Sequence, residues 1–182
     1  MSLLEAFSEL EGSDSLHEGR LLLLVSAFSP EAEVGGIAGL TKLAKLDFLL
    51  RYPVLLERAL TARGRSTRAV ELQDFERSSV ESRMVRYRFG PWDHRYRRFL
   101  NLLSAKGLIR VEANSRPVQI TITRIGKDAA NSLIQDEAFQ DVSRRAAALK
   151  THFDLQGSYL MRFIYETFPE IVSLKSNEAI DI

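Results

Sequence analysis

The 182-residue chain contains no cysteine, and it has only ten glycines and five prolines. The lack of cysteine excludes disulfide frameworks, thiolate zinc sites, iron–sulfur clusters and cysteine nucleophiles. The scarcity of glycine and proline excludes collagen-like chains, and a hydrophobic fraction of 45% is too high for a disordered chain. A cysteine-free chain of this kind fits a cytoplasmic protein, and we expect that location here.

Long apolar segments are also missing. The first ten residues carry Glu5 and Glu9 and no early positive charge, so we expect no signal peptide. The longest apolar run, around 21–25, is far shorter than a bilayer span. We therefore expect one compact unit without a membrane partner.

Catalytic and metal-binding motifs are absent as well. The histidines, His17, His94 and His152, lack the spacing of metal ligands. Gly35 and Gly36 are not followed by a Gly-Lys-Ser/Thr element, and there is no Gly-x-Ser-x-Gly. The carboxylates are scattered, so no acid–base pair stands out. We expect a protein that is not an enzyme and that holds no metal or cofactor.

Charge is distributed unevenly along the chain, although the total is only +1. Residues 1–34 hold one basic and seven acidic residues, a net charge of −6. Residues 83–117 hold nine basic and two acidic residues, a net charge of +7. The contrast predicts separate surfaces for different partners.

Helical patterns dominate the first third of the chain. Ser15 begins a capping box, and the leucine-rich run that follows predicts a helix buried on most sides. Apolar spacing predicts further helices over 37–51 and 54–62. Residues 64–79 are polar and weakly patterned, which predicts a loop with about one helical turn.

The period then changes to that of a sheet. Residues 84–89 alternate apolar and basic side chains, which predicts a strand, and Gly90-Pro91 predicts a turn. Asp93 is a suitable N-cap for a helix over 94–105. The apolar face of that helix consists of Tyr96, Phe99, Leu100 and Leu103.

Two short strands and a further helix come next. Gly107 ends the preceding helix, the strands span 108–111 and 118–122, and a polar hairpin tip joins them. Thr123 caps a helix whose inner face should carry Ile125. The stretches 102–109 and 120–126 resemble the winged helix-turn-helix family. The expected fold class is thus mainly α with a small β-wing (α+β), a winged-helix core flanked by N- and C-terminal helices.

This pattern divides the chain into five parts within one compact unit. They are an acidic segment (1–14), an N-terminal helical part (15–64), a connecting loop (65–83), the winged-helix core (84–135) and a C-terminal helical part (136–182).

Basic residues cluster on the central helix, on its flanking strands and at the wing. A winged helix usually presents these elements to DNA, where such side chains would contact phosphates. The candidate DNA-binding residues are Arg86, Arg88, Arg95, Arg97, Arg98, Lys106, Arg110 and Arg116. Alternatively, these side chains are solvated, or the acidic N-terminal segment of the same chain covers part of them.

The last helical segment, 158–168, is rich in aromatic residues. Four of them are candidates for a partner interface: Tyr159, Phe163, Tyr165 and Phe168. Alternatively, this helix packs on the N-terminal leucine-rich helix.

Four phrases carry a wider resemblance: residues 39–53 (GLTKLAKLDFLLRYP), 85–92 (VRYRFGPW), 107–109 (GLI) and 164–170 (IYETFPE). As a set they resemble the small middle components of bacterial ABC-three-component defence systems of the Lamassu type. The resemblance covers most of the chain from about Arg20 onward.

The resemblance implies a non-catalytic subunit in defence against phage or plasmid DNA. Such a subunit would bridge an ABC ATPase of the SMC or Rad50 kind and an effector, often a nuclease, as the winged-helix accessory subunits of condensins do. Contact with double-stranded DNA is compatible with this role. Two alternatives stay open: a stand-alone winged-helix transcription regulator, and a winged helix whose basic patch binds an acidic protein.

Overall fold

The structure is a computed structural model, and it describes residues 14–77, 85–87 and 90–180. These residues are mostly helical, with a small three-stranded antiparallel sheet and a separate two-stranded hairpin. The expected fold class, mainly α with a little β, is confirmed at this level.

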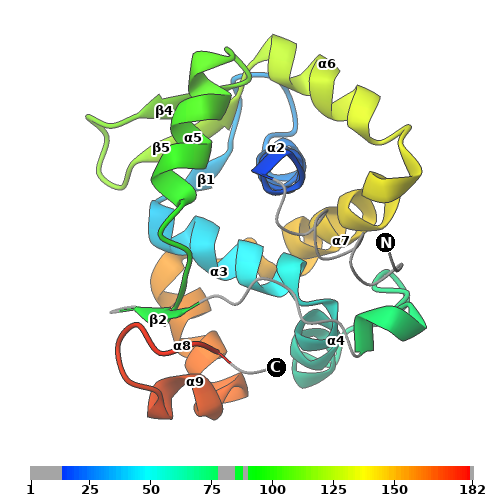
Figure 1. Ribbon diagram of the computed structural model, residues 1–182, viewed down its shortest axis with the longest axis vertical. Helices are drawn as coiled ribbons and strands as arrows, with labels where there is room; N and C mark the ends of the chain where they lie inside the picture. Colours follow the sequence, from blue (N-terminus) through cyan, green and yellow to red (C-terminus); the bar gives the residue numbers. More distant parts are fainter. Residues whose placement is uncertain (1–13, 78–84, 88–89, 181–182) are drawn as a thin grey trace, which may run out of the picture.

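The elements follow one another along the chain as Figure 1 labels them. They are α2 (Asp14–Phe28), β1 (Ile37–Ala38), α3 (Leu40–Arg51), α4 (Pro53–Ala62), the 3-10 turn η1 (Asp74–Arg77), β2 (Val85–Tyr87), β3 (Gly90–Trp92), α5 (Tyr96–Ala105), β4 (Ile109–Glu112), β5 (Gln119–Ile122), α6 (Arg124–Leu133), α7 (Glu137–Phe153), α8 (Gly157–Thr167) and α9 (Pro169–Ser173).

Helix α2 forms the centre of the molecule, as the leucine-rich run predicted. Figure 1 shows it end-on, with α5, α6, α7 and α3 around it. Every residue from Leu21 to Val25 is buried. Close packing by α7 depends on Gly19, because a Cβ there would lie 2.7 Å from the Phe139 ring. The burial of a helix on nearly all sides explains why it has almost no polar face.

The three-stranded sheet has the order β1-β5-β4. Ile37 pairs with Ile120, and Ile109 pairs with Ile122, so the buried faces of the strands meet α2 and α5. The cap at Thr123 is confirmed: its Oγ1 accepts a hydrogen bond from the Gly126 amide (3.0 Å) and donates to the Gly107 carbonyl (2.6 Å). One threonine thus joins the end of the sheet to the start of α6.

Three local predictions were wrong. Residues 37 and 38 form β1 instead of the first turn of a helix, because Ile37 gains a partner in β5. Gly90-Pro91 is part of β3, which pairs with β2, instead of a turn. The α6 side chain of Ile125 is 64% exposed, although the periodicity placed it inward.

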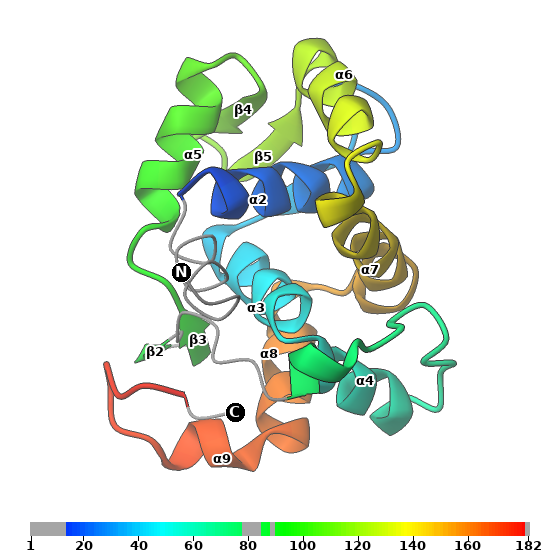
Figure 2. The ribbon, with the colours of Figure 1, turned by 45° about the vertical axis from the view of Figure 1, so that its right-hand side comes forward.

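The alternative in which the aromatic helix 158–168 packs on the N-terminal leucine-rich helix is wrong. Helix α7 is the one that packs on α2, whereas the aromatic helix α8 packs mainly on α3 and α4 (Figure 2). Phe48 of α3 makes an edge-on ring contact with Phe168, with centroids 5.6 Å apart. The sequence required a second surface to cover Phe48, and α8 with its C-cap residue supplies it.

The loop after α4 is pinned to α7. Its single helical turn is confirmed as η1. The buried guanidinium of Arg145 donates to the carbonyls of Val70 (2.7 Å) and Glu71 (3.2 Å) and binds the Glu76 carboxylate (2.6 Å). Residues 65–77 are mostly polar, and these contacts hold them in a defined conformation.

Candidate functional site

The expected basic surface lies on α5, the end of α5, β4 and the hairpin between β4 and β5. Six of the eight candidate DNA-binding residues are described there: Arg95, Arg97, Arg98, Lys106, Arg110 and Arg116. Arg88 and the side chain of Arg86 lie outside the described part of the chain.

Three of these cations are paired with carboxylates of α2 or of the loop that follows it. Arg98 binds Asp14 and Lys106 binds Glu18, both on α2. Arg110 binds Glu33 (2.9 Å) in the loop that follows α2. The acidic N-terminal part therefore covers the basic surface at three positions, as one of the two alternatives predicted. The three basic side chains are still more than half exposed, so the pairs are open to water and salt.

Two of the three remaining arginines are different. Arg97 and Arg116 are exposed, and within the described residues neither makes a hydrogen bond or an ion pair. Arg97 stands at the mouth of a cavity, and Arg116 precedes the cis bond to Pro117 in the hairpin. These two side chains are available to an anionic partner without displacing a carboxylate of the chain itself.

Beneath α5 lies a buried ionic network that the sequence interpretation missed. Asp47 of α3 is fully buried and accepts hydrogen bonds from Arg20 (2.6 Å), Arg51 (3.0 Å) and the Tyr96 hydroxyl (2.7 Å). Arg51 also donates to Asp93 (3.0 Å). These contacts tie α2 and α3 to the first turn of α5. The only signal in the sequence was an acid and a base four residues apart within a leucine-rich helix.

The network fixes the charge of its acids. Burial alone would raise the pKa of Asp47, but the charges of Arg20 and Arg51 outweigh it and lower that pKa to about 2. Burial also opposes the ionisation of Asp93, yet hydrogen bonds from Arg95 and the charge of Arg51 lower its pKa. Both carboxylates are ionised at neutral pH, and each balances buried or half-buried arginines.

Arg95 belongs to this network more than to the surface. Its guanidinium binds Asp93 (2.8 Å) and lies over the Phe99 ring, 5.3 Å from the centroid. His17 is buried beside it and stacks on the same ring. Burial lowers the pKa of His17 to about 4, with help from Arg20, Arg51 and Arg95. His17 is thus neutral, and Arg95 positions the start of α5.

The four aromatic candidates for a partner interface divide between core and surface. Phe168 is fully buried, which contradicts its assignment to an exposed interface. Phe163 is half-buried and packs on Phe153, 5.4 Å between centroids. Tyr159 is 60% exposed, and Tyr165 is half-buried at the edge of a groove. Only Tyr159 and Tyr165 are placed to meet a partner.

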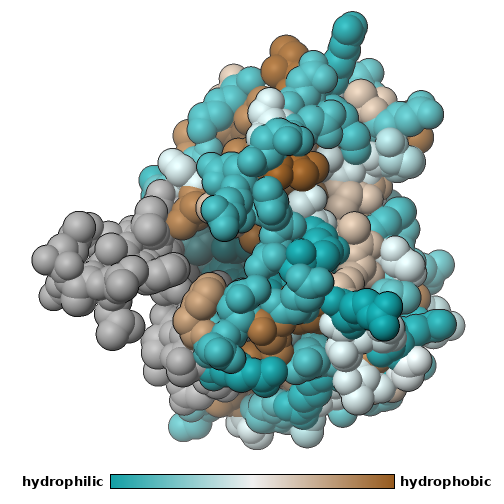
Figure 3. Space-filling view, turned by 90° about the vertical axis from the view of Figure 1, so that its right-hand side faces the viewer, coloured by the Kyte–Doolittle hydropathy of each residue, from teal (hydrophilic) through white to brown (hydrophobic). Residues whose placement is uncertain are grey.

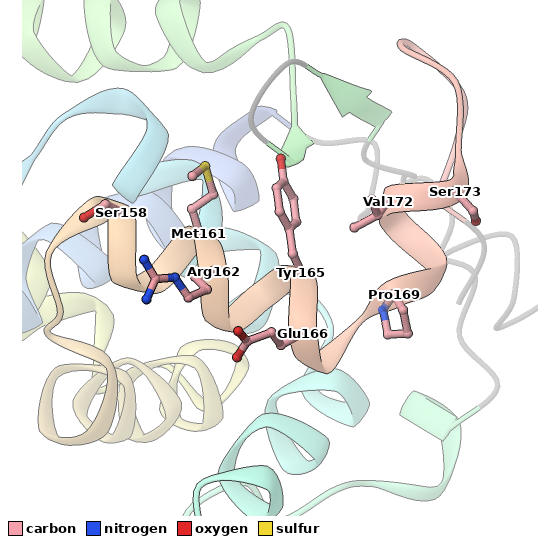
Figure 4. A pocket seen from close by; sticks show the side chains of 8 residues that line it. All are labelled: Ser158, Met161, Arg162, Tyr165, Glu166, Pro169, Val172 and Ser173. Atoms are coloured by element: carbon pink, nitrogen blue, oxygen red, sulfur yellow. The ribbon is translucent and has the colours of Figure 1, made fainter.

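That groove runs between α8 and α9 and has a volume of about 680 Å³. Figure 4 shows Tyr165 of α8 and Val172 of α9 on facing sides of it, with Met161 farther along α8 and Pro169 at the start of α9. Arg162 and Glu166 of α8 also line it. Val172 is 42% exposed. The lining is mainly apolar, and the groove is open to solvent.

On the face that Figure 3 shows, hydrophilic side chains predominate and hydrophobic ones form small separate patches. Within the residues described here, no group of His, Asp and Glu is arranged to hold a metal ion. In the same part of the chain, no helix is long and apolar enough to cross a membrane.

A scan against protein-family models, a search of curated proteins and a search of solved structures each give no match. The functional conclusions therefore rest on the residues and their geometry, together with the resemblance stated above.

Proposed function

We propose that the chain is a non-catalytic accessory subunit with a winged-helix core. In this role it bridges an SMC- or Rad50-like ABC ATPase and an effector nuclease in defence against phage or plasmid DNA. The proposal combines the resemblance of the sequence phrases with two properties of the fold, its element order and its α8–α9 groove.

The element order supports the winged-helix part of the proposal. Helix, strand and helix (α2, β1, α3) precede α5, and the hairpin β4–β5 follows it. The returning strand β5 lies between β4 and β1. The fold departs from a simple helix-turn-helix between α3 and α5. There, α4, η1 and the β2–β3 hairpin replace the short turn. Such an insertion suits an assembly component better than a minimal DNA reader.

The single observation that carries the proposal is the groove between α8 and α9. It lies outside the winged-helix elements, and its walls are Met161, Tyr165, Pro169 and Val172. Exposed apolar side chains that line a groove and are bordered by polar ones are typical of protein interfaces. A subunit that joins two proteins needs a surface of this kind separate from its core.

A stand-alone transcription regulator is the second candidate. The free guanidinium groups of Arg97 and Arg116 favour it, since both could contact phosphates. Against it stand Asp14, Glu18 and Glu33, which occupy the neighbouring cations and would repel the DNA backbone. We therefore rank DNA contact below protein contact.

Co-purification tests the proposal. The tagged chain is co-expressed with a candidate long coiled-coil ATPase and a candidate effector nuclease, and the recovered chains are identified. The double variant Met161→Glu, Val172→Asp places charge in the groove and should lower recovery of at least one partner about tenfold. Ile125→Asp is the matched control, because Ile125 is an exposed apolar residue on another helix, and it should leave recovery unchanged.

Recovery of neither partner by the wild-type chain would contradict the proposal. Specific binding to an operator upstream of its own gene, by a chain that recruits no ATPase, would establish the regulator instead. Equal recovery by the groove variant and the control would remove the groove as the interface.

A further inference from the structure

A second cavity lies on the other side of the β2–β3 hairpin from the α8–α9 groove. It is enclosed by the start of α3, by β3 and by the start of α5, and its volume is about 430 Å³. Its apolar walls come from Leu40, Ala44, Pro91 and Trp92. A volume of this size falls within the range of about 300–1,000 Å³ that is usual for binding pockets.

The charged side chain among the described residues that line this cavity is Arg97. Thr41 and His94 are the other polar lining residues, and no carboxylate lines it within the part of the chain that the structure describes. The nearest acid in the sequence, Asp93, is occupied by Arg51 and Arg95. The cavity therefore combines an apolar interior with a cation at its mouth.

A further positive charge lies behind the wall. Lys45 is fully buried and donates to the carbonyl of Thr41, a lining residue, at 3.3 Å. Within the described residues it has no ion-pair partner, and burial lowers its pKa to about 8. A carboxylate held nearby would stabilise the charged form of this lysine.

We propose that this cavity binds an acidic segment of a partner protein, with an apolar side chain of that segment inserted against Trp92 and a carboxylate paired with Arg97. The inference rests on the proposed function, because it names the chemistry of the partner that an accessory subunit would hold. Charge complementarity selects this occupant: the lining offers the Arg97 cation and apolar surface together.

Duplex DNA fits the same cavity less well. Its phosphates would gain Arg97, but they would also approach Asp14 and Glu18, which pair with Arg98 and Lys106 along α5. Moreover, the apolar walls give no favourable contact to a phosphate. An acidic peptide supplies both the charge and the apolar anchor.

The cavity and the α8–α9 groove share one wall. Gly90 lines the cavity, and a Cβ at Gly90 would lie 3.4 Å from the ring of Tyr165, which lines the groove. Gly90 also has a positive φ of 108°, so a side chain there would be strained.

Trp92 makes the proposal measurable, since it is the only tryptophan in the chain. The full-length protein is titrated with a ten-residue peptide of Asp and Glu around a central Leu-Phe pair, and tryptophan emission is recorded. We expect a saturable change. Arg97→Glu should weaken binding at least about tenfold, whereas Arg116→Glu, the matched exposed and unpaired arginine, should bind as the wild type does. A thermal melt of each variant confirms that it is folded.

Three results would overturn the proposal. The first is no saturable change with the acidic peptide, or the same change with a peptide in which Lys replaces the acids. The second is a change produced by a 20-base-pair duplex and not by the peptide, which would assign the cavity to DNA. The third concerns the acidic residues Glu5, Glu9 and Glu11. If changing them to Gln alters Trp92 emission while the peptide does not compete, the occupant is the chain's own segment.

The outcome is separable from that of the proposed function. If Arg97→Glu leaves peptide binding unchanged but the groove variant still loses a partner in co-purification, only the inference about the cavity fails. If the peptide binds as expected and no ATPase or effector is recovered, the inference about the cavity is kept and the proposed function fails.

Discussion

Two ionic regions lie on opposite sides of α5. They contain the same residue types, but one is buried and the other is in contact with water. On the inner side, Asp47 is fully buried among Arg20, Arg51 and Tyr96. On the outer side, Arg98 and Lys106 pair with Asp14 and Glu18 in contact with water. The inner groups are shielded from water, whereas water and salt can replace the outer pairs.

This difference shows which charges hold the fold and which can serve a partner. The inner network connects α2, α3 and the start of α5, so it determines where the outer face of α5 stands. The outer pairs contribute little to stability, and they set how strongly the surface attracts an anion. Each of the following predictions tests one side of the comparison.

The largest effect is expected from Asp47→Asn. Removal of this charge takes from two buried guanidinium groups, those of Arg20 and Arg51, the carboxylate that they share, which costs about 3–5 kcal/mol in the free energy of unfolding. Urea denaturation measures it. Asp14→Asn removes the corresponding carboxylate from an exposed pair and should cost less than about 1 kcal/mol. Equal losses in the two variants would mean that burial does not separate the two regions.

A pH effect of similar size is expected from His17. Its pKa falls from 6.5 to about 4 on folding, so the unfolded chain binds the proton more readily between these values. The free energy of unfolding should therefore be unaffected above about pH 6.5 and should decrease by an amount on the order of 3 kcal/mol as the pH falls to about 4. Denaturation at a series of pH values measures the slope.

His17→Phe supplies the control for that slope, because a phenyl ring can still stack on Phe99 but cannot take up a proton. The variant should lose most of the decrease between pH 6.5 and 4. An undiminished decrease would show that other groups cause it.

A smaller effect is expected from the outer pairs. Glu18→Gln, which leaves Lys106 without its carboxylate, should lower the free energy of unfolding by less than about 1 kcal/mol. The difference from the wild type should shrink as salt is raised from 0.05 to 0.5 M, since exposed charges are screened. A loss of several kcal/mol that persists in high salt would show that this pair contributes as much to stability as the inner network does.

The smallest effect is expected on DNA affinity. The triple variant Asp14→Asn, Glu18→Gln, Glu33→Gln frees three cations, so binding to a duplex should strengthen several-fold at low salt. Fluorescence anisotropy at two salt concentrations measures it. If affinity does not change at either concentration, DNA does not meet this face.

Local signals in the sequence predicted most of the elements. Thr123 and Gly107 are confirmed at the ends of α6 and α5, because capping depends on residues a few positions apart. The same holds for the buried face of α5, where Tyr96, Phe99 and Leu103 share one stripe. Periodicity and capping are short-range properties, so one sequence is enough to find them.

What the sequence could not supply depends on long-range pairing. Ile37 forms a strand only because β5 lies beside it, and Phe168 is buried only because α3 supplies Phe48. The network around Asp47 joins residues from α2, α3, the turn before α5 and α5 itself. The grooves likewise arise where separate elements meet, and no local pattern marks them.

The most direct test of the central claim is the composition of the complex that the chain forms. Native mass spectrometry of the chain co-expressed with the candidate ATPase and effector should detect one assembly that contains all three. The Met161→Glu, Val172→Asp variant should lack at least one of the partners. A wild-type chain that is found only alone or as a homodimer, and that binds an operator sequence, would contradict the account.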